Sequence, residues 1–215
     1  INSTLTLTAG SIITGVNTVI IPASGTVART SGFVHGFLTK NVATGSNVSR
    51  TFEIGTATEY TPLDILFASV SVTGNFTASS TASDHPSIGI SGFNASLTVN
   101  RYWTLTNATT VYTTYSATPT FVNGDTDPGY NTNNSIVRTY NGSTWSTPNL
   151  GTVTSNSAQA LFLNTPVTPN TIYLQIGEST PSTTGRLYSI ATGNWSTPGN
   201  WSETSGGPNC FCVPT

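Results

Sequence analysis

The segment Asp125-Thr-Asp-Pro-Gly129 carries hard oxygen donors at alternate positions around a turn, a pattern that can wrap a calcium ion. The candidate ligands are Asp125, Asp127 and Asn131. No glutamate follows to supply a bidentate ligand, and Asp, Pro and Gly are also ordinary turn residues. A plain turn is therefore the alternative, and calcium is the one metal or cofactor that the sequence suggests.

Residues for enzymatic chemistry do not form a recognisable set. His35 and His85 lack metal-ligand spacing, and no Gly-x-Ser-x-Gly segment marks a nucleophilic serine. Glu53 and Glu59 lie in ordinary β contexts, so a pair of catalytic carboxylates is equally unsupported. We predict a protein that is not an enzyme and has no cofactor other than the candidate calcium ion.

Three aromatic residues could stack on the apolar faces of sugars, namely Tyr130, Tyr140 and Trp145. Neighbouring Asn and Thr side chains would satisfy the sugar hydroxyls. Packing in the core or at a seam is the alternative. This platform supports a second functional hypothesis, a glycan-binding adhesin module that recognises surface glycans.

The longest clean alternation of apolar and polar residues lies in Leu97–Asn107 and predicts a central strand. One face of that strand holds Val99, Arg101, Trp103 and Leu105. An arginine on an apolar face needs its stem packed and its guanidinium paired. The candidate partners are Glu53, Glu59 and Asp64. We expect Arg101 to be structural, at the rim of the core.

Residues 26–180 show β runs at the spacing of about 8 to 12 residues that is typical of an antiparallel sandwich. The Asn141-Gly142 pair between two such runs favours a two-residue hairpin loop. That register would place Arg138 opposite Trp145.

Residues 1–25 contain two short β runs separated by Gly10 and Gly15, a rhythm like one coil of a β-solenoid. One coil cannot bury its apolar side alone, so it must lie against the main domain, another chain or further sequence. The apolar residues assigned to such a contact are Leu5, Leu7 and Ile12.

Residues 181–215 differ again in composition and contain a near repeat, Gly193-Asn-Trp-Ser196 and Gly199-Asn-Trp-Ser202. The segment has too little local sequence to bury Trp195 and Trp201, which favours packing at a seam with another copy or domain. Cys210 and Cys212 are the two cysteines. Their short separation makes a mutual bridge strained, which leaves a bridge to residues outside the chain or two free thiols.

The composition excludes some classes of function. Only 7% of the residues are charged, with one lysine and five arginines, so the chain has no basic surface for nucleic acid. No apolar run is long enough to cross a bilayer as a helix, so no membrane span is expected. Low charge, no methionine, 42 Thr and 26 Ser suit an exported, extracellular β protein, and nine Asn-x-Ser/Thr sites permit glycosylation.

Three segments together resemble large, repetitive, secreted surface proteins of Bacteroidota-type bacteria. They are Val99–Thr106, Phe52–Pro62 and Ser189–Ser202. In that family an Ig-like β-sandwich alternates with β-solenoid sections. The resemblance implies that this chain begins with the last coil of one solenoid section and ends with the first segment of the next, and it implies roles such as surface fibre, adhesin or sheath.

These observations predict an all-β chain: an Ig-like antiparallel β-sandwich with short β-solenoid-like or extended strand segments at both termini. The expected function is a non-enzymatic structural subunit on the cell surface or in a secreted fibre. Copies would assemble head-to-tail into a filament, of the kind found in biofilms, because unlike surfaces that meet head-to-tail do not close. The residues assigned to the contact are Leu5, Leu7, Ile12, Trp195, Trp201, Cys210 and Cys212.

Overall fold

The computed structural model describes residues 1–163, 170–180, 187–203, 205–210 and 212. Regular structure in these residues is almost entirely β-strand, with four 3-10 turns between strands. The predicted all-β class is confirmed. No helix among the described residues is long and apolar enough to cross a membrane.

The larger sheet has nine strands. They are β2 (Ser11–Ile21), β4 (Phe33–Val42), β6 (Ile54–Thr56), β7 (Glu59–Tyr60), β9 (Gly74–Thr81), β10 (Phe93–Asn107), β13 (Ile136–Tyr140), β14 (Trp145–Ser146) and β17 (Asn170–Ser179). Their order is β14-β13-β17-β10-β9-β4-β6-β7, with β2 also paired to β4. The predicted central strand, β10, lies between β9 and β17 and is antiparallel to both.

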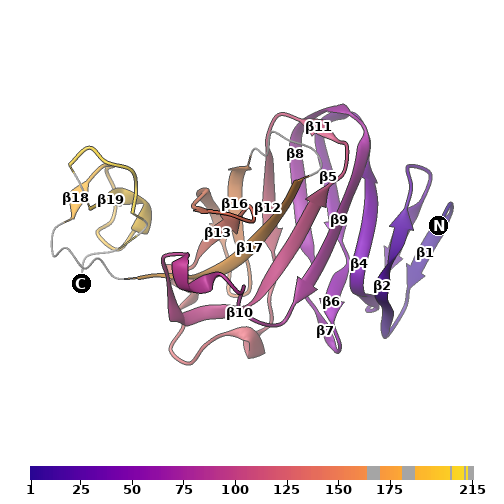
Figure 1. Ribbon diagram of the computed structural model, residues 1–215, viewed down its shortest axis with the longest axis horizontal. Coiled ribbons are helices and arrows are strands. Elements are labelled where there is room, and N and C mark those ends of the chain that lie inside the picture. The colour runs from indigo at the N-terminus through magenta and orange to yellow at the C-terminus, as the bar shows by residue number, and fades with distance from the viewer. Residues whose placement is uncertain (164–169, 181–186, 204, 211, 213–215) are drawn as a thin grey trace.

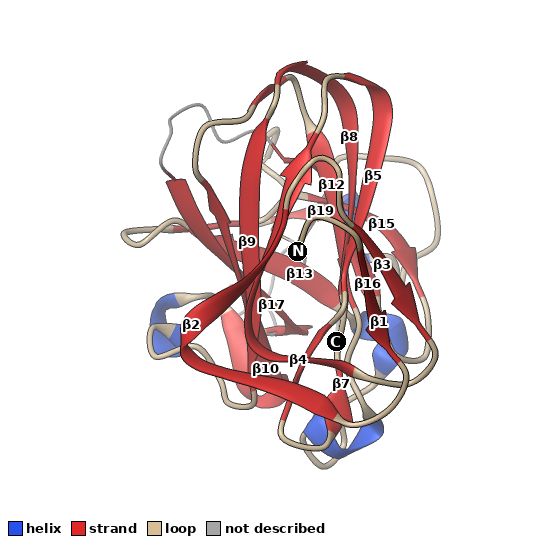
Figure 2. Cartoon of the chain, turned by 90° about the vertical axis from the view of Figure 1, so that its right-hand side faces the viewer, coloured by secondary structure: helices blue, strands red, loops and turns tan. Residues whose placement is uncertain are grey.

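The smaller sheet has six strands. They are β5 (Gly45–Phe52), β8 (Leu63–Val72), β11 (Val111–Tyr112), β12 (Tyr115–Pro119), β15 (Asn149–Val153) and β16 (Ala158–Leu163). The order β11-β8-β12-β16-β15, with β5 paired to β8, is antiparallel throughout. The two sheets form the two layers of a β-sandwich, and in Figure 2 β9 and β17 of the larger sheet lie to the left of β5 and β8 of the smaller sheet.

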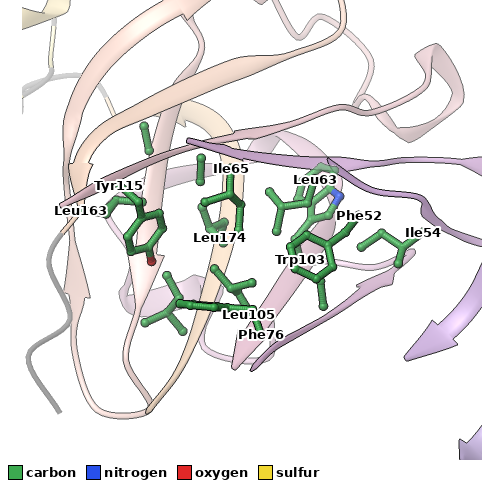
Figure 3. Packing of buried hydrophobic residues seen from close by; sticks show 14 of the residues in the cluster. Phe52, Ile54, Leu63, Ile65, Phe76, Trp103, Leu105, Tyr115, Leu163 and Leu174 are labelled. Atoms are coloured by element: carbon green, nitrogen blue, oxygen red, sulfur yellow. The ribbon is translucent and has the colours of Figure 1, made fainter. Parts of the chain in front are cut away.

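One hydrophobic cluster fills the space between the layers and draws on both sheets. Figure 3 shows Trp103 beside Phe52 and Leu63, and Tyr115 beside Leu163. Trp103 is fully buried, and its indole Nε1 donates a hydrogen bond of 3.0 Å to the carbonyl oxygen of Thr61. The residues predicted to share one face of β10, Val99, Arg101, Trp103 and Leu105, are all buried.

The N-terminal segment adds two parallel pairings to this largely antiparallel fold. β1 (Thr4–Leu7) pairs with β3 (Thr26–Arg29), and β2 pairs with β4. Thr4 is paired with Thr26 and Ser11 with Phe33, so the first partners of both pairings are the same number of residues apart in the sequence. A turn between β2 and β3 is closed by a hydrogen bond from the Gly25 amide to the Pro22 carbonyl. β2 thereby joins the nine-stranded sheet.

The hairpin prediction at Asn141 is wrong in its register. Tyr140 is paired with Trp145, so the loop has four residues instead of two, and Arg138 does not face Trp145. The cause is the Asn141 side chain, whose Oδ1 accepts hydrogen bonds from the Ser143 and Thr144 amides at 2.9 and 2.8 Å. These bonds stabilise a wider turn than the two-residue form. The Arg138 guanidinium instead donates to Thr147 Oγ1.

The C-terminal segment forms a small unit with β18 (Tyr188–Ser189) antiparallel to β19 (Trp201–Ser202). Cys210 and Cys212 form a disulfide with each other, which the sequence argument disfavoured. Their Cα atoms lie 5.2 Å apart, inside the usual range for a bridge. Folding back on β19 orients the pair, because the Cys210 amide donates to the Trp201 carbonyl.

Candidate functional site

The three predicted calcium ligands have separate partners. Asp125 is buried against Arg101, and Asp127 accepts hydrogen bonds from Thr98 and Asn100. The Asn131 side chain accepts from the Asn133 amide and so stabilises a 3-10 turn. No group of three His, Cys, Asp or Glu side chains that could hold a metal occurs among the described residues.

Arg101 is the centre of a buried polar network. Its Nε and Nη2 atoms donate to the two carboxylate oxygens of Asp125 at 2.7 and 2.8 Å, and Nη2 also reaches Glu59 at 2.5 Å. Nη1 donates to Thr56 and Ser80 hydroxyls at 3.0 Å each. These bonds occupy all five guanidinium N–H groups. Arg101 is therefore fully used inside the protein and has no donor left for a ligand. Of its predicted partners Glu59 is found, whereas Asp64 and Glu53 are not.

Two of the three residues assigned to sugar stacking come together. The Tyr140 and Trp145 ring centroids are 5.1 Å apart, with an angle of 40° between the planes. Both rings pack on His85, as do two further tyrosines from β10 and β17, Tyr102 and Tyr173. The rings are tilted around a buried histidine and do not form one flat platform.

His85 is held in its neutral form. Burial lowers the pKa of its imidazole, because the charged form loses hydration there. Its Nδ1 accepts a hydrogen bond of 3.1 Å from the Ser87 amide, which requires that nitrogen to be unprotonated. His85 is thus packed under four half-buried aromatic rings on the outer face of the nine-stranded sheet, over β10, β13, β14 and β17.

Tyr130 lies away from this cluster. Its ring packs against the main core, with its centroid 6.3 Å from that of Phe121. Its hydroxyl forms a hydrogen bond with the Ser135 hydroxyl. Burial raises the pKa of Tyr130 to about 12, and the nearby charge of Glu178 adds to the effect. Tyr130 therefore serves packing, and the three predicted sugar-stacking residues do not form one surface.

The N-terminal edge of the nine-stranded sheet is the most exposed apolar surface of the described chain. Ile13 is 72% exposed and Val16 is 95% exposed, and Ile12 and Ile20 are also exposed. Leu7 is buried and Leu5 half-buried, so these two support the coil from inside. Of these residues, Ile12 was predicted from the sequence to lie at a contact, and Ile13, Val16 and Ile20 were not. We call the free sides of β1 and β2 the open edge.

A bulge shapes the open edge. The Thr14 hydroxyl turns inward and accepts a hydrogen bond of 3.1 Å from the Phe37 amide. A Cβ at position 36 would lie 2.0 Å from that hydroxyl, and Gly36 has a φ of +123°, so glycine is required there. The β2–β4 register shifts between Ile13 and Thr18, and Val16 projects into solvent.

The open edge carries no charged side chain. No Lys, Arg, Asp or Glu precedes Arg29 in the sequence. Among the described strands, β1 pairs only with β3 and β2 only with β4. Natural edge strands usually bear lysine, proline or an inward charge that prevents pairing with another chain. A sequence signal for this surface existed, namely the uncharged stretch with recurring isoleucines.

A second apolar surface lies on the C-terminal unit. Tyr188, Ile190 and Trp195 are exposed, and we call these three residues the tail surface. Trp201 is buried, with its ring 4.5 Å from that of Trp195 and its Nε1 donating to the Trp195 carbonyl at 2.9 Å. The segment thus buries one of the two tryptophans locally, although the sequence argument expected it to bury neither.

The open edge and the tail surface lie at opposite ends of the molecule. In Figure 1 the strands β1 and β2 stand at the right-hand end of the long axis, and β18 and β19 stand at the left-hand end. Comparisons with protein-family models, curated proteins and solved structures find no match to this chain. The open edge and the tail surface are therefore the features from which a function can be inferred.

Proposed function

We propose that this chain is a non-enzymatic, extracellular structural module whose copies assemble head-to-tail into a surface fibre or filament. The observation that carries the proposal is the open edge, a β edge without charged side chains on which Ile13 and Val16 are exposed. Such an edge offers unpaired backbone groups and apolar side chains together, and another chain can satisfy both by adding a strand.

The partner in this proposal is a second copy, docked through its tail surface. The described part of the chain has thirteen exposed large apolar side chains, and nine of them lie at one of these two ends. Three form the tail surface. The other six are Ile12, Ile13, Val16 and Ile20 of β2, together with Ile1 and Phe37, which we count with the open edge because Phe37 is paired with β2. Contacts between unlike surfaces at opposite ends repeat without closing, so they produce filaments.

The finer architecture in this proposal follows the observed pairings. Residues 1–25 act as a β-solenoid-like coil, since β1 and the first residues of β2 pair in parallel with β3 and β4 at one shared offset, as one solenoid coil stacks on the next. The bulge after Ile13 then shifts the register. Residues 26–180 form the Ig-like sandwich, and the described part of residues 181–215 provides the surface for the neighbouring copy. The Cys210–Cys212 disulfide supports an extracellular location, because such bridges persist in oxidising compartments.

A mixing experiment with the full chain tests the polarity of assembly. Ile13→Lys blocks the open edge, and Trp195→Ser removes the largest side chain of the tail surface. Each variant alone should stay monomeric in sedimentation velocity. Their mixture should form dimers that grow no further, because each dimer joins the one intact edge to the one intact tail. Filaments from either variant alone, or a mixture that stays monomeric, would contradict head-to-tail assembly.

The glycan-binding alternative has less support. His85 occupies the middle of the ring cluster that contains Tyr140 and Trp145, and Tyr130 packs elsewhere. Sugar-dependent quenching of tryptophan fluorescence by a monomeric chain would favour it.

A further inference from the structure

A second group of residues stands out because it joins two strands through buried polar atoms. Thr98 on β10 and Gln175 on β17 are both 0% exposed. Asp84 and Asp127 approach them from two loops that the sandwich brings together. None of these side chains takes part in the Arg101 network or in either terminal surface.

The hydroxyl of Thr98 and the carboxamide of Gln175 meet at a single oxygen atom. Thr98 Oγ1 donates to Asp84 Oδ1 at 2.8 Å, and Gln175 Nε2 donates to the same Oδ1. Thr98 Oγ1 and Gln175 Nε2 are therefore separated by at most two hydrogen-bond lengths. Folding holds the two side chains together before any reaction, which lowers the entropic cost of a reaction between them.

The Gln175 carbonyl is polarised on its other side. Its Oε1 accepts a hydrogen bond of 2.9 Å from the backbone amide of His85. A fixed N–H group of this kind, away from water, stabilises the negative charge that develops on an oxygen when the carbonyl carbon is attacked. The amide nitrogen, which would leave, donates to Asp84 and to the Val99 carbonyl.

Two carboxylates face the Thr98 hydroxyl. Asp84 Oδ1 lies 2.8 Å and Asp127 Oδ2 lies 3.1 Å from Oγ1, although the hydroxyl has only one proton. Burial raises the pKa of Asp84, and the charge of Asp127 adds to it. A carboxylate with a raised pKa is a better proton acceptor, as a general base for an alcohol must be.

We propose that Thr98 and Gln175 form an intramolecular ester bond between β10 and β17. Asp84 accepts the proton of the Thr98 hydroxyl while Oγ1 attacks Cδ of Gln175. The His85 amide holds the resulting oxyanion. The C–N bond then breaks, Asp84 returns the proton to the leaving nitrogen, and ammonia departs. One O–H and one C–N bond are exchanged for one C–O and one N–H bond, so the step needs no oxidant, reductant or co-reactant.

The bond would connect the last strand of the sandwich to its centre. β17 leads toward the C-terminal unit, and β10 is the central strand of the larger sheet. A covalent link here would prevent β17 from separating under load. This inference stands independently of the proposed assembly, because an isolated monomer would carry the bond as well.

The intact mass of the folded full chain tests the proposal directly. Loss of ammonia lowers the mass by about 17 Da from that of the 22.4 kDa sequence with its disulfide. Tandem mass spectrometry of a digest should then find the peptides containing Thr98 and Gln175 joined. Alkaline hydrolysis should separate them and leave a glutamate at position 175. A mass equal to that of the unmodified sequence, with Thr98 and Gln175 in separate linear peptides, would overturn the proposal.

Matched variants locate the bond. Thr98→Ser keeps a hydroxyl and should keep the loss of mass, whereas Thr98→Val and Gln175→Glu should abolish it. Thr106→Val is the control, because the Thr106 hydroxyl also bridges β10 to β17 by bonding Thr171 at 2.8 Å but faces no carboxamide. A succinimide at an Asn-Gly pair would give the same loss of mass, and it would persist in Thr98→Val. A loss of mass that persists in Thr98→Val would overturn the assignment of the bond to Thr98, whether or not that variant folds.

Discussion

β10 at the centre of the nine-stranded sheet and β2 at its edge differ in what their side chains meet. On β10 the one charged side chain, Arg101, has five hydrogen-bond donors and five bonds, and the apolar residues on its face are buried. On β2 there is no charge, and several isoleucines and a valine face solvent. The charged side chain of β10 is thus fully hydrogen-bonded within the chain, whereas the apolar side chains of the open edge are left in contact with solvent.

This difference separates stability from association. Removing a charged group from the interior of the sandwich should destabilise the folded chain, because the buried charge that remains loses its partner. Changing the open edge should leave folding intact and alter only what the chain binds, because those side chains have few contacts to lose.

The largest effect is expected for Arg101→Met. The change leaves the buried carboxylate of Asp125 without its partner, and removal of one member of a buried ion pair costs about 3–5 kcal/mol of unfolding free energy. Denaturant unfolding measures the loss. Arg50→Met is the control. Within the described part of the chain that guanidinium bonds the Asn41 and Ser49 carbonyls near the surface, so the change should cost about 1 kcal/mol or less. Equal losses in the two variants would contradict the special role of Arg101.

A smaller effect is expected from the neutral histidine. The folded chain lowers the pKa of His85 by burial, so below its ordinary value of 6.5 the unfolded chain binds a proton that the folded chain does not. The stability that depends on neutral His85 is fully present above that ordinary value and is lost as the pH falls through the lowered, folded-state pKa. His85→Phe should flatten this part of the curve of unfolding free energy against pH. Parallel curves for the two proteins would show that His85 does not titrate with folding.

The smallest effect on the sandwich is expected for the double change Cys210→Ser and Cys212→Ser. The bridge lies within the C-terminal unit, next to the Trp201 carbonyl. Unfolding of the sandwich should change by about 0.5 kcal/mol or less, while the fluorescence of Trp195 and Trp201 should change. A large loss of sandwich stability would mean that the C-terminal unit supports the main fold.

Local sequence patterns predicted the parts of this molecule that depend on local physics. The alternation in Leu97–Asn107 located β10 and placed Arg101 on its buried face, because a strand has a strict period of two. The hairpin register failed, since one side chain, Asn141, selected a wider turn. The disulfide was disfavoured by spacing alone, because the folding of residues around β19 was not visible in the sequence.

Contacts between distant segments could not be predicted from local sequence patterns. Asp125 lies 24 residues from Arg101, and Asp84 lies 91 residues from Gln175. Only the order of strands brings such groups together, and residue spacing does not encode that order. The Asp84-His85 pair was visible in the sequence, but its partners were not.

Replacing an exposed isoleucine by lysine, either on the open edge or away from it, tests assembly through the open edge most directly. Ile13 on the open edge is 72% exposed and Ile90 in a 3-10 turn is 71% exposed, so Ile13→Lys and Ile90→Lys remove equal apolar surface and add equal charge. Negative-stain electron microscopy with sedimentation of the full chain measures the outcome. Our account predicts filaments from the parent chain and from Ile90→Lys, and monomers of unchanged stability from Ile13→Lys. Filaments from Ile13→Lys that match those of Ile90→Lys would contradict it.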